Sequence, residues 1–408
     1  MLQKLILSFK NFIEKIVYYF YMRTIPKKIE CIRKKDKIKV LFVLADLSKW
    51  KTETLYQEMT KHDRFEPILG VTFKTDDKPT ESARKLFQLI EYLKTKKYSY
   101  EELIREGYIK EYIKPDIIIY QEPYLLTILR GHNYLNNLNS LFISITYGFH
   151  SVLLPFNNIG GLKEIAWFDC YENESTAKDA REYIKNGRKN ICVTGLPMSE
   201  LLLNKQDYKE VWKNVTPKKR IIWAPHHSIG FNYETITYGN FLTIADDMIR
   251  MAEKYKDKVH WAFKPHPLLK YKLELIWGSE KTEDYYSYWR NSNHTQLEEG
   301  DYIDLFKQSD AMIHDCDTFT IEYLYMNKPV MFVDKKDCMK ENLNSFAKNA
   351  LDVHYRGNDI SDIEEFINNI IISNDILKTK RNEFFIAQID IPLAKNASKN
   401  IMEKIING

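Results

Sequence analysis

Three polar stretches in the second half of the chain each follow an apolar run and contain side chains that can contact a phosphate. Because the carboxyl ends of parallel strands meet at one edge of a sheet, we expect the three to lie together. Lysine and histidine side chains and the hydroxyl of Thr318 can all donate hydrogen bonds to phosphate oxygens. The pattern therefore predicts a phosphate-binding crevice. The stretches are Ala224-Pro225-His226-His227-Ser228, Lys264-Pro265-His266-Pro267 and His314-Asp315-Cys316-Asp317-Thr318.

Residues 301–333 predict the elements that position the third stretch. A helical turn ends near Asp310, a short strand covers 311–313, and a helix runs from the turn at 314–318 to Asn327. Glu322 lies one helical turn after Thr318, so its carboxylate can accept the hydroxyls of a ribose. The backbone amides at the helix start contribute only about 0.3–1 kcal/mol per anion contact. We therefore expect Lys264 or His266 to share the binding of a diphosphate.

The alternation of apolar runs with amphipathic segments predicts an α/β fold of two Rossmann-like, doubly wound domains and an N-terminal amphipathic helix. We expect a helix and basic linker at 1–35, a first domain at 36–212, a second domain at 213–390 and a C-terminal helix at 391–408. Residues 98–113 are predicted to be helical. The polar and aromatic tract 278–300 is predicted to lie outside the core.

Composition limits the classes of function. The 408 residues are 44% hydrophobic and 28% charged, which is typical of a globular protein with a sizeable core. A net charge of +4 is too small to indicate nucleic acid as a partner. The five cysteines form no C-x-x-C pair, which argues against a disulfide framework or a zinc site and favours a reducing cytosol.

The first 23 residues place apolar side chains on one helical face, but lysines and Glu14 interrupt the run too often for a membrane span. No small-residue cleavage site follows, so a secretory signal is not indicated. A basic string from Arg23 to Lys35 comes next. This combination favours contact with the cytoplasmic membrane surface. The other interpretation is a helix that docks on the protein's own core or on a partner.

Several motifs resemble those of the CDP-glycerol glycerophosphotransferase family, the teichoic-acid primases and polymerases. The resemblance spans about residues 140–335 and weakens in the first 130 residues. It rests on the Asp301 to Asp310 pattern, on Asp315-Cys316-Asp317-Thr318 followed by Glu322 and Asn327-Lys328-Pro329, on His266-Pro267, on Thr194-Gly195-Leu196-Pro197 and on Ala224-Pro225.

This resemblance implies the GT-B arrangement of two Rossmann-like domains, with the acceptor domain at 36–212 and the nucleotide-donor domain at 213–390. It also assigns roles to individual residues. His266 would contact the donor diphosphate, Thr318 would bind phosphate and Glu322 would hold the ribose. The family's acceptor-activating histidine lies in a Trp-His-Gly-Thr segment. Here the corresponding segment reads Tyr147-Gly148-Phe149-His150-Ser151, in which His150 is the candidate general base.

The chain departs from the family pattern at three places. Asp317 replaces a serine and is expected to cap the helix, His226-His227 replaces a Thr-Trp pair, and Met198 replaces an arginine. Asp317, His226 and His227 are also predicted to belong to the donor-binding site. Asp315-Cys316-Asp317 resembles a D-x-D metal motif, but such short matches are common by chance, and its place before a helix that begins at Thr318 fits phosphate binding better. His226, His227 and His266 could ligate a metal, but no fixed short spacing supports this, so we expect no metal and no cofactor.

The sequence therefore predicts a peripheral enzyme at the cytoplasmic face of the membrane. It would move a glycerol-phosphate or related alditol-phosphate unit from a CDP-activated donor to a lipid-linked glycan or surface-polymer acceptor. His150 and His266 are the candidate catalytic residues. One alternative is a GT-B glycosyltransferase that uses a nucleotide sugar. Another is a non-catalytic, membrane-bound partner in a polymer-synthesis complex.

Overall fold

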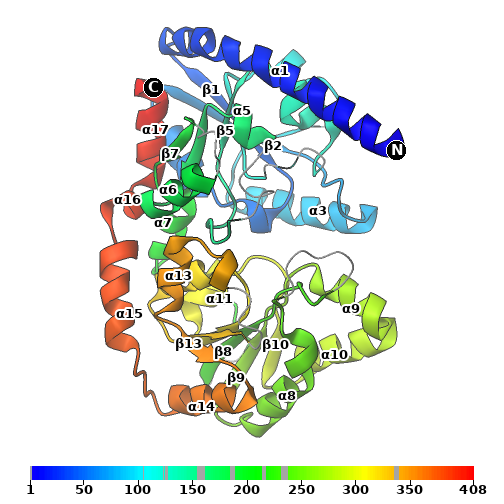
Figure 1. Ribbon diagram of the computed structural model, residues 1–408, viewed down its shortest axis with the longest axis vertical. Coiled ribbons are helices and arrows are strands. Elements are labelled where there is room, and N and C mark those ends of the chain that lie inside the picture. Colours follow the sequence, from blue (N-terminus) through cyan, green and yellow to red (C-terminus); the bar gives the residue numbers. More distant parts are fainter. Residues whose placement is uncertain are drawn as a thin grey trace. The chain divides into compact units, whose positions relative to one another are not determined.

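The computed structural model describes residues 2–103, 105–122, 124, 127–153, 161–183, 189–213, 217–230, 238–334 and 340–408, and side chains from residue 15 onward. These residues form two compact units, each built on one parallel sheet (Figure 1). The first unit is Met1–Gly148, Leu154–Glu200 and Asn396–Gly408. The second is Phe149–Leu153 and Leu201–Lys395.

The first unit has a seven-stranded sheet in the order β3-β2-β1-β4-β5-β6-β7, with every pair of neighbours parallel. The strand order reverses between β1 and β4, which makes their carboxyl ends the switch point of a doubly wound sheet. The strands are β1 (Ile38–Leu44), β2 (Phe65–Val71), β3 (Tyr100–Glu102), β4 (Ile117–Tyr120), β5 (Leu141–Ser144), β6 (Phe168–Tyr171) and β7 (Ile191–Val193).

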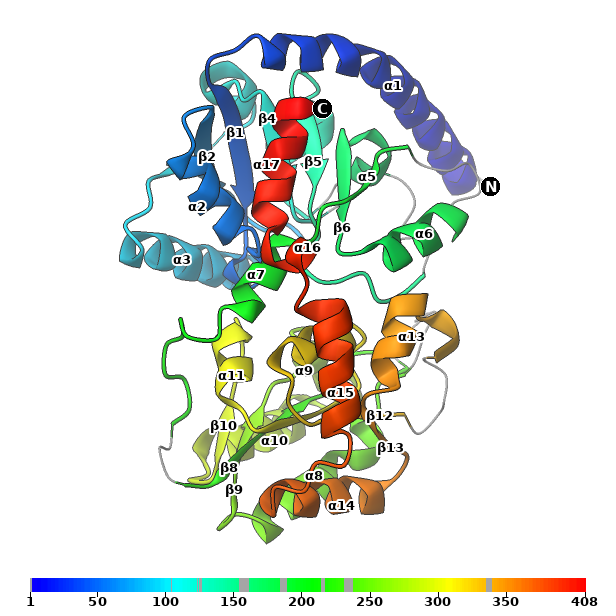
Figure 2. The same ribbon diagram turned by 90° about the vertical axis from the view of Figure 1, so that its left-hand side faces the viewer.

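Helices from both ends of the chain pack on this sheet. The C-terminal α17 crosses one of its faces beside α2 (Figure 2), and the side chain of Ser398 on α17 donates to Glu200. The helices are α1 (Leu2–Arg33), α2 (Glu53–Lys61), α3 (Pro79–Thr95), α5 (Leu162–Ile165), α6 (Glu174–Tyr183), α7 (Pro197–Leu203) and α17 (Ala397–Asn407).

The second unit has a six-stranded parallel sheet in the order β10-β9-β8-β11-β12-β13, with its switch point between β8 and β11. The strands are β8 (Lys219–Ala224), β9 (Val259–Phe263), β10 (Thr295–Leu297), β11 (Ala311–His314), β12 (Val330–Val333) and β13 (Tyr355–Gly357). The helices are α8 (Phe241–Lys254), α9 (Leu269–Trp277), α10 (Ser279–Asn291), α11 (Ile303–Gln308), α12 (Phe319–Glu322), α13 (Ser345–Leu351), α14 (Ile360–Ile371), α15 (Lys378–Phe384) and α16 (Pro392–Lys395).

Large aromatic side chains fill the core of the second unit. Trp223 of β8 stacks on Phe241 and Phe263, and Trp289 of α10 packs against it with ring centroids 5.4 Å apart. The prediction that residues 278–300 lie outside the core is therefore wrong. The charged residues of α10 are exposed or half-buried, while Thr282, Tyr285, Tyr286 and Trp289 are buried on its inner side.

The prediction that residues 98–113 form a helix is also wrong. Residues 100–102 form β3, which pairs in parallel with β2 and is the edge strand of the sheet. Gly107 then takes a φ of +82°, a left-handed conformation that interrupts a right-handed helix, and only a single helical turn follows at Ile109–Ile113. Local helical spacing was overridden by a long-range strand pairing.

The first helix is longer than the sequence indicates, because α1 continues to Arg33 through the basic segment that was expected to be a linker. It packs near α5 and β5 (Figure 1). The Tyr21 hydroxyl donates to the carbonyl of Ser140 at 2.9 Å, and its ring stacks on Phe142. This part of α1 docks on the first unit. The expected apolar face of residues 2–14 involves side chains outside the described set. No helix of the described residues combines the length and apolarity needed to cross a bilayer.

Candidate functional site

The polar residues of the second unit lie at the carboxyl ends of three adjacent strands. His226 follows β8, His266 follows β9 and Asp315 follows β11, and these strands are neighbours in the order β9-β8-β11. The loops after β8 and β11 leave the sheet at its switch point. The fold thus brings two stretches 89 residues apart into direct contact, since the backbone amide of His226 donates to the Asp315 carboxylate at 2.6 Å.

Asp315 joins three segments of backbone. Its second carboxylate oxygen accepts from the amide of Asn240 at 2.5 Å, and the Asn240 side chain donates to the carbonyl of Val333 at 2.9 Å. Burial raises the pKa of Asp315 to about 7, against the opposing effect of these hydrogen bonds. Asp315 and Asn240 therefore set the shape of the site, and sequence reasoning missed both roles because the partners are distant in the chain.

Three histidines gather beside this carboxylate. The ring of His226 lies 4.2 Å from that of His227 and 4.9 Å from that of His266, measured between centroids, and His227 lies 4.1 Å from His266. Tyr238 stacks on the other side of His226 at 4.8 Å. His226 is buried, whereas His227 and His266 are half-buried. The three predicted histidines form one cluster, called here the histidine cluster.

Hydrogen bonds define the tautomers of the three rings. Each Nδ1 accepts from a donor: the amide of Ser228 for His226 (3.2 Å), the Lys272 amine for His227 (2.6 Å) and the amide of Leu268 for His266 (3.1 Å). A neutral imidazole that accepts at Nδ1 carries its proton on Nε2. Each ring of the histidine cluster therefore carries its proton on Nε2, and the Nε2–H of His226 lies 3.4 Å from the Tyr238 hydroxyl. A metal ion needs a nitrogen lone pair, so this pattern suits an anion better than a metal, although three ring nitrogens lie within 4.8 Å of one another.

The protonation state of the buried ring follows from its surroundings. Burial, with a smaller contribution from the nearby Lys272, lowers the pKa of His226 to about 3. His226 is therefore neutral at physiological pH and acts as a neutral hydrogen-bond donor. Positive charge beside the cluster comes from Lys272.

The predicted Lys264 and Glu322 are connected through a tyrosine. The Lys264 amine lies 5.9 Å from the ring centroid of Tyr302, and the Tyr302 phenol hydrogen-bonds to Glu322. Glu322 has 1% of its surface exposed and Lys264 has 5%. Sequence reasoning missed Tyr302, although it lies in the segment that carries the family pattern. Its hydroxyl covers the carboxylate that was expected to hold a ribose.

Asp317 and Thr318 adjoin the histidine cluster. Carboxylate, thiol and ring atoms of Asp317, Cys316 and His226 lie within 4.8 Å of one another. The Asp317 carboxylate accepts from the amide of Thr318, while the Thr318 hydroxyl interacts with the Cys316 thiol and makes no capping bond. The backbone amide of Thr318, at the start of α12, thus donates to the Asp317 carboxylate.

His150 lies in the second unit, although the sequence boundaries assigned it to the first. Residues 149–153 form a strap that pairs with residues 342–344: Val152 bridges Leu343, and the amide of Leu153 donates to the carbonyl of Asn342 at 2.9 Å. The side chain of Asn344 donates to the His150 carbonyl. Because long-range pairing decides where this strap docks, boundaries read along the chain misplace it.

Comparison with known proteins supports the same fold. No curated protein sequence matches the chain. The structure is similar to that of the wall teichoic acid polymerase TagF, with a TM-score of 0.59 at 14% identity, covering 96% of this chain and 96% of the other. It is also similar to a UDP-GlcNAc 2-epimerase from Neisseria meningitidis, with a TM-score of 0.56 at 14% identity, covering 91% and 100%. At this identity both similarities show the fold alone.

A sequence comparison decides the family. The family model described as CDP-glycerol:poly(glycerophosphate) glycerophosphotransferase matches residues 172–385, more than half of the chain, including β8, β9, β11 and the loops that follow them. The resemblance seen in the motifs, the two-sheet α/β fold and the class of enzyme are confirmed. The chain belongs to the CDP-glycerol:poly(glycerophosphate) glycerophosphotransferase family.

Proposed function

We propose that this glycerophosphotransferase binds the diphosphate of CDP-glycerol on the histidine cluster and transfers glycerol phosphate to a surface-polymer acceptor. One observation carries the proposal: the rings of His226, His227 and His266 lie 4.1–4.9 Å apart, each with its proton on Nε2, beside the Lys272 amine. A hydrogen bond to a charged group contributes about 1.5–3 kcal/mol. Three such bonds supply several times the stabilisation expected from a helix N-terminus alone.

In this proposal the diphosphate lies over His226, His227 and His266, with Thr318 at its edge. The neighbouring Asp317 would repel the phosphates if its carboxylate were bare. Its charge is directed instead into hydrogen bonds from Ser151, the amide of Thr318 and Tyr238. These bonds support a role for Asp317 in shaping the donor site rather than in direct contact with phosphate.

The ribose end of the donor would lie toward Glu322. Glu322 is buried and hydrogen-bonded to Tyr302, so a ribose hydroxyl would displace the phenol and take its place on the carboxylate. The exchange keeps one hydrogen bond on the buried carboxylate, and the displaced phenol would then donate to the ligand or to another neighbour. Lys264, beside the same tyrosine ring, would face the phosphate end of the nucleotide.

Chemistry would proceed by direct transfer. His150 takes the proton from an acceptor hydroxyl as that oxygen bonds to the β-phosphorus of the donor. The bond from this phosphorus to the bridging oxygen breaks, and CMP leaves with the electron pair. Hydrogen bonds from the histidine cluster stabilise the charge that builds on the phosphates. His150 is half-buried and its carbonyl is held by Asn344, which keeps it in the unit that binds the donor.

The acceptor in this proposal is lipid-linked and lies at the cytoplasmic membrane surface. Support comes from α1, where Ile16, Tyr19, Phe20 and Met22 expose between 40% and 61% of their surface. The Arg23 guanidinium lies 4.3 Å from the Tyr19 ring centroid, which joins a cation to the exposed aromatic side chains. Aromatic rings next to basic side chains suit an anionic lipid interface.

A ligand panel with product analysis tests the proposal. Thermal shift with CDP-glycerol, CDP-ribitol, CDP and UDP- or GDP-sugars should show stabilisation by the cytidine nucleotides. Turnover should release CMP, and His150→Ala should abolish turnover while CDP-glycerol still binds. Lack of stabilisation by every cytidine nucleotide would overturn the proposal. Release of UDP or GDP from a sugar donor would indicate a glycosyltransferase. Polymer formation in cells by inactive His150→Ala would indicate a non-catalytic partner.

A further inference from the structure

A second pocket lies in the first unit, at the carboxyl ends of β1 and β4. The order of strands reverses between these two, so the pocket occupies the switch point of its own sheet, the position at which doubly wound domains bind ligands. None of the residues assigned above to donor binding lies in it. The side chains that matter here are Asp46, Lys49, Glu122, Tyr120, Asn133 and Tyr134.

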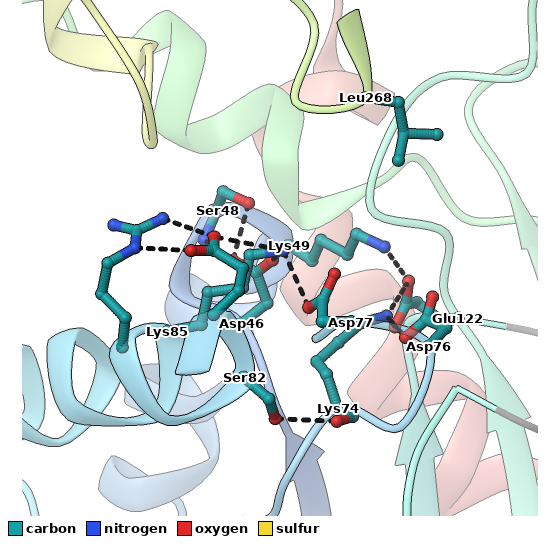
Figure 3. Close-up of polar contacts among 12 residues, drawn as sticks. Asp46, Ser48, Lys49, Lys74, Asp76, Asp77, Ser82, Lys85, Glu122 and Leu268 are labelled. Atoms are coloured by element: carbon teal, nitrogen blue, oxygen red, sulfur yellow. Dashed lines mark hydrogen bonds and ion pairs between the residues drawn. The ribbon is translucent and has the colours of Figure 1, made fainter. Parts of the chain in front are cut away.

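Glu122 in this pocket is shared by two lysines (Figure 3). The Lys74 amine lies 2.9 Å and 3.2 Å from its two carboxylate oxygens, and the Lys49 amine contacts one of them as well. The Lys74 side chain is 1% exposed, whereas that of Lys49 is 27% exposed. One carboxylate thus holds a buried and an accessible cation. Lys74 also pairs with Asp76 at 3.0 Å.

Asp46, on the other side of the pocket, has a cation of its own. Lys85 lies 3.4 Å from Asp46 and 3.0 Å from Asp77, and the amide and hydroxyl of Ser48 donate to Asp46 (Figure 3). Burial alone would raise the pKa of Asp46, but Lys85, Ser48 and Lys49 outweigh it and lower the pKa. Asp46 is therefore ionised and paired without needing Lys49 as its direct partner.

Lys49 is consequently the lysine whose amine can leave its carboxylate partner and turn to a ligand. If the Lys49 amine turns to an incoming anion, Glu122 keeps Lys74 and Asp46 keeps Lys85, so no buried charge is left without an opposite charge. The amine already lies at an aromatic edge, 4.8 Å from the ring centroid of Tyr147. An anion bound here would gain a charge-assisted hydrogen bond.

The rest of the pocket suits hydroxyl groups. Glu122 and Asp46 supply carboxylate oxygens, which accept from hydroxyls, while Asn133 supplies an amide. Tyr120 and Tyr134 contribute ring surface with 4% of each residue exposed. Tyrosine rings with a few fixed polar groups are typical of pockets that bind small polar ligands.

We infer that this pocket binds a phosphorylated polyol, with its phosphate on the Lys49 amine and its hydroxyls on Glu122, Asp46 and Asn133. Under the proposed function, on which this role rests, that ligand is the growing end of the acceptor. The acceptor site is then built by the first unit alone and recognises both charge and hydroxyls. A neutral polyol or a bare phosphate would make only half of these contacts.

Calorimetric titration of the full chain with glycerol 3-phosphate tests the inference, with saturating CDP present to fill the nucleotide site. Lys49→Gln should weaken binding about tenfold, the size of one charge-assisted contact. Lys94→Gln is the matched control, because Lys94 is an exposed lysine of α3 in the same unit that pairs with Glu91, and it should leave binding unchanged. Glycerol and inorganic phosphate, titrated separately, should each bind more weakly.

Glu122→Gln separates binding from a purely structural role. Glutamine keeps a side-chain oxygen that accepts a ligand hydroxyl, leaves Lys74 with Asp76 and no longer pairs with Lys49, so glycerol 3-phosphate should bind several-fold more tightly. A structural ion pair would predict lower stability and no gain in affinity. Lys49→Gln binding as tightly as wild type, or glycerol 3-phosphate failing to bind a protein that binds CDP, would overturn the inference.

The two proposals fail separately in this experiment. Glycerol 3-phosphate binding that depends on Lys49 in a protein that does not bind CDP would overturn the donor proposal and leave the pocket assignment standing. CDP binding by a protein in which glycerol 3-phosphate binding does not depend on Lys49 would overturn the pocket assignment and leave the donor proposal standing. Titration of each variant with CDP-glycerol provides this comparison, and wild-type affinity is expected for Lys49→Gln.

Discussion

The Ser151 hydroxyl donates to the Asp317 carboxylate at 3.1 Å, across 166 residues of sequence. Ser151 follows the candidate base His150, and Asp317 lies in the loop that adjoins the histidine cluster. The strap at 149–153 and the loop that holds Asp317 therefore belong to one unit. This pairing holds His150, the proposed base, in the unit that carries the histidine cluster, where the donor is proposed to bind.

The strap yields the first prediction. In Asn344→Asp the side-chain oxygen that caps α13 by accepting from Ala347 is kept, but the donor to the His150 carbonyl is lost. We expect kcat to fall about tenfold, the effect of a misplaced base, while affinity for CDP-glycerol stays within twofold. Steady-state kinetics and calorimetry measure the two quantities. An unchanged kcat in a folded variant would contradict the positioning role of Asn344.

The histidine cluster yields the second prediction. His266→Asn removes one Nε2–H donor and should weaken CDP-glycerol binding by about 1.5–3 kcal/mol. His62→Asn is the matched control, because exposed His62 in the first unit also accepts the amide two residues on at Nδ1. Calorimetry should show wild-type affinity for that control. If both variants bind equally well, the cluster does not hold the diphosphate.

Glu322 yields the third prediction, which concerns the ribose. Wild-type protein should bind CDP more tightly than 2′-deoxy-CDP by about 1–2 kcal/mol, because the deoxy nucleotide leaves a buried acceptor without its hydroxyl. Glu322→Gln should weaken CDP binding and largely remove the difference between the two nucleotides. Competition binding measures all four affinities. An equal preference for CDP in both proteins would exclude Glu322 as the ribose contact.

The fourth prediction concerns stability and pH. Burial lowers the pKa of His354 to about 3 in the folded protein, against about 6.5 when unfolded. The unfolded state therefore binds more protons between these values, and stability falls as pH drops below about 6.5. His354→Asn lacks this penalty. Relative to wild type it should gain about 2 kcal/mol between pH 7 and pH 5, measured by urea unfolding. A pH-independent difference would contradict this.

The exposed aromatic side chains of α1 yield the fifth prediction. Phe20→Ser should lower co-sedimentation with vesicles that contain anionic lipid, because the 61% exposed ring loses its interfacial contact. Tyr208→Ser serves as a control, since Tyr208 is 50% exposed in the second unit. Raising the salt concentration should weaken binding of all three proteins. Equal sedimentation of the two variants would point away from α1.

The local pattern of the chain predicted elements with short-range causes. Residues 311–333 fold as strand, turn, helix and strand, because an apolar run, a polar turn and Pro329 specify them within a few positions. The same reasoning found the three strand ends of the candidate donor site. It failed at β3 and α10, where pairing with β2 and packing against Trp223 decided the outcome.

The sequence by itself determined the family, the two parallel sheets and the chemical groups at the ends of β8, β9 and β11, since motifs and periodicity are local properties. Only the tertiary structure decided how these groups act. The Nε2 protons of the histidine cluster depend on donors such as Lys272, 45 residues from His227. Likewise, the pairing of residues 149–153 with residues 342–344 assigns His150 to the second unit. Such contacts arise between segments whose distance in space is independent of their distance in sequence.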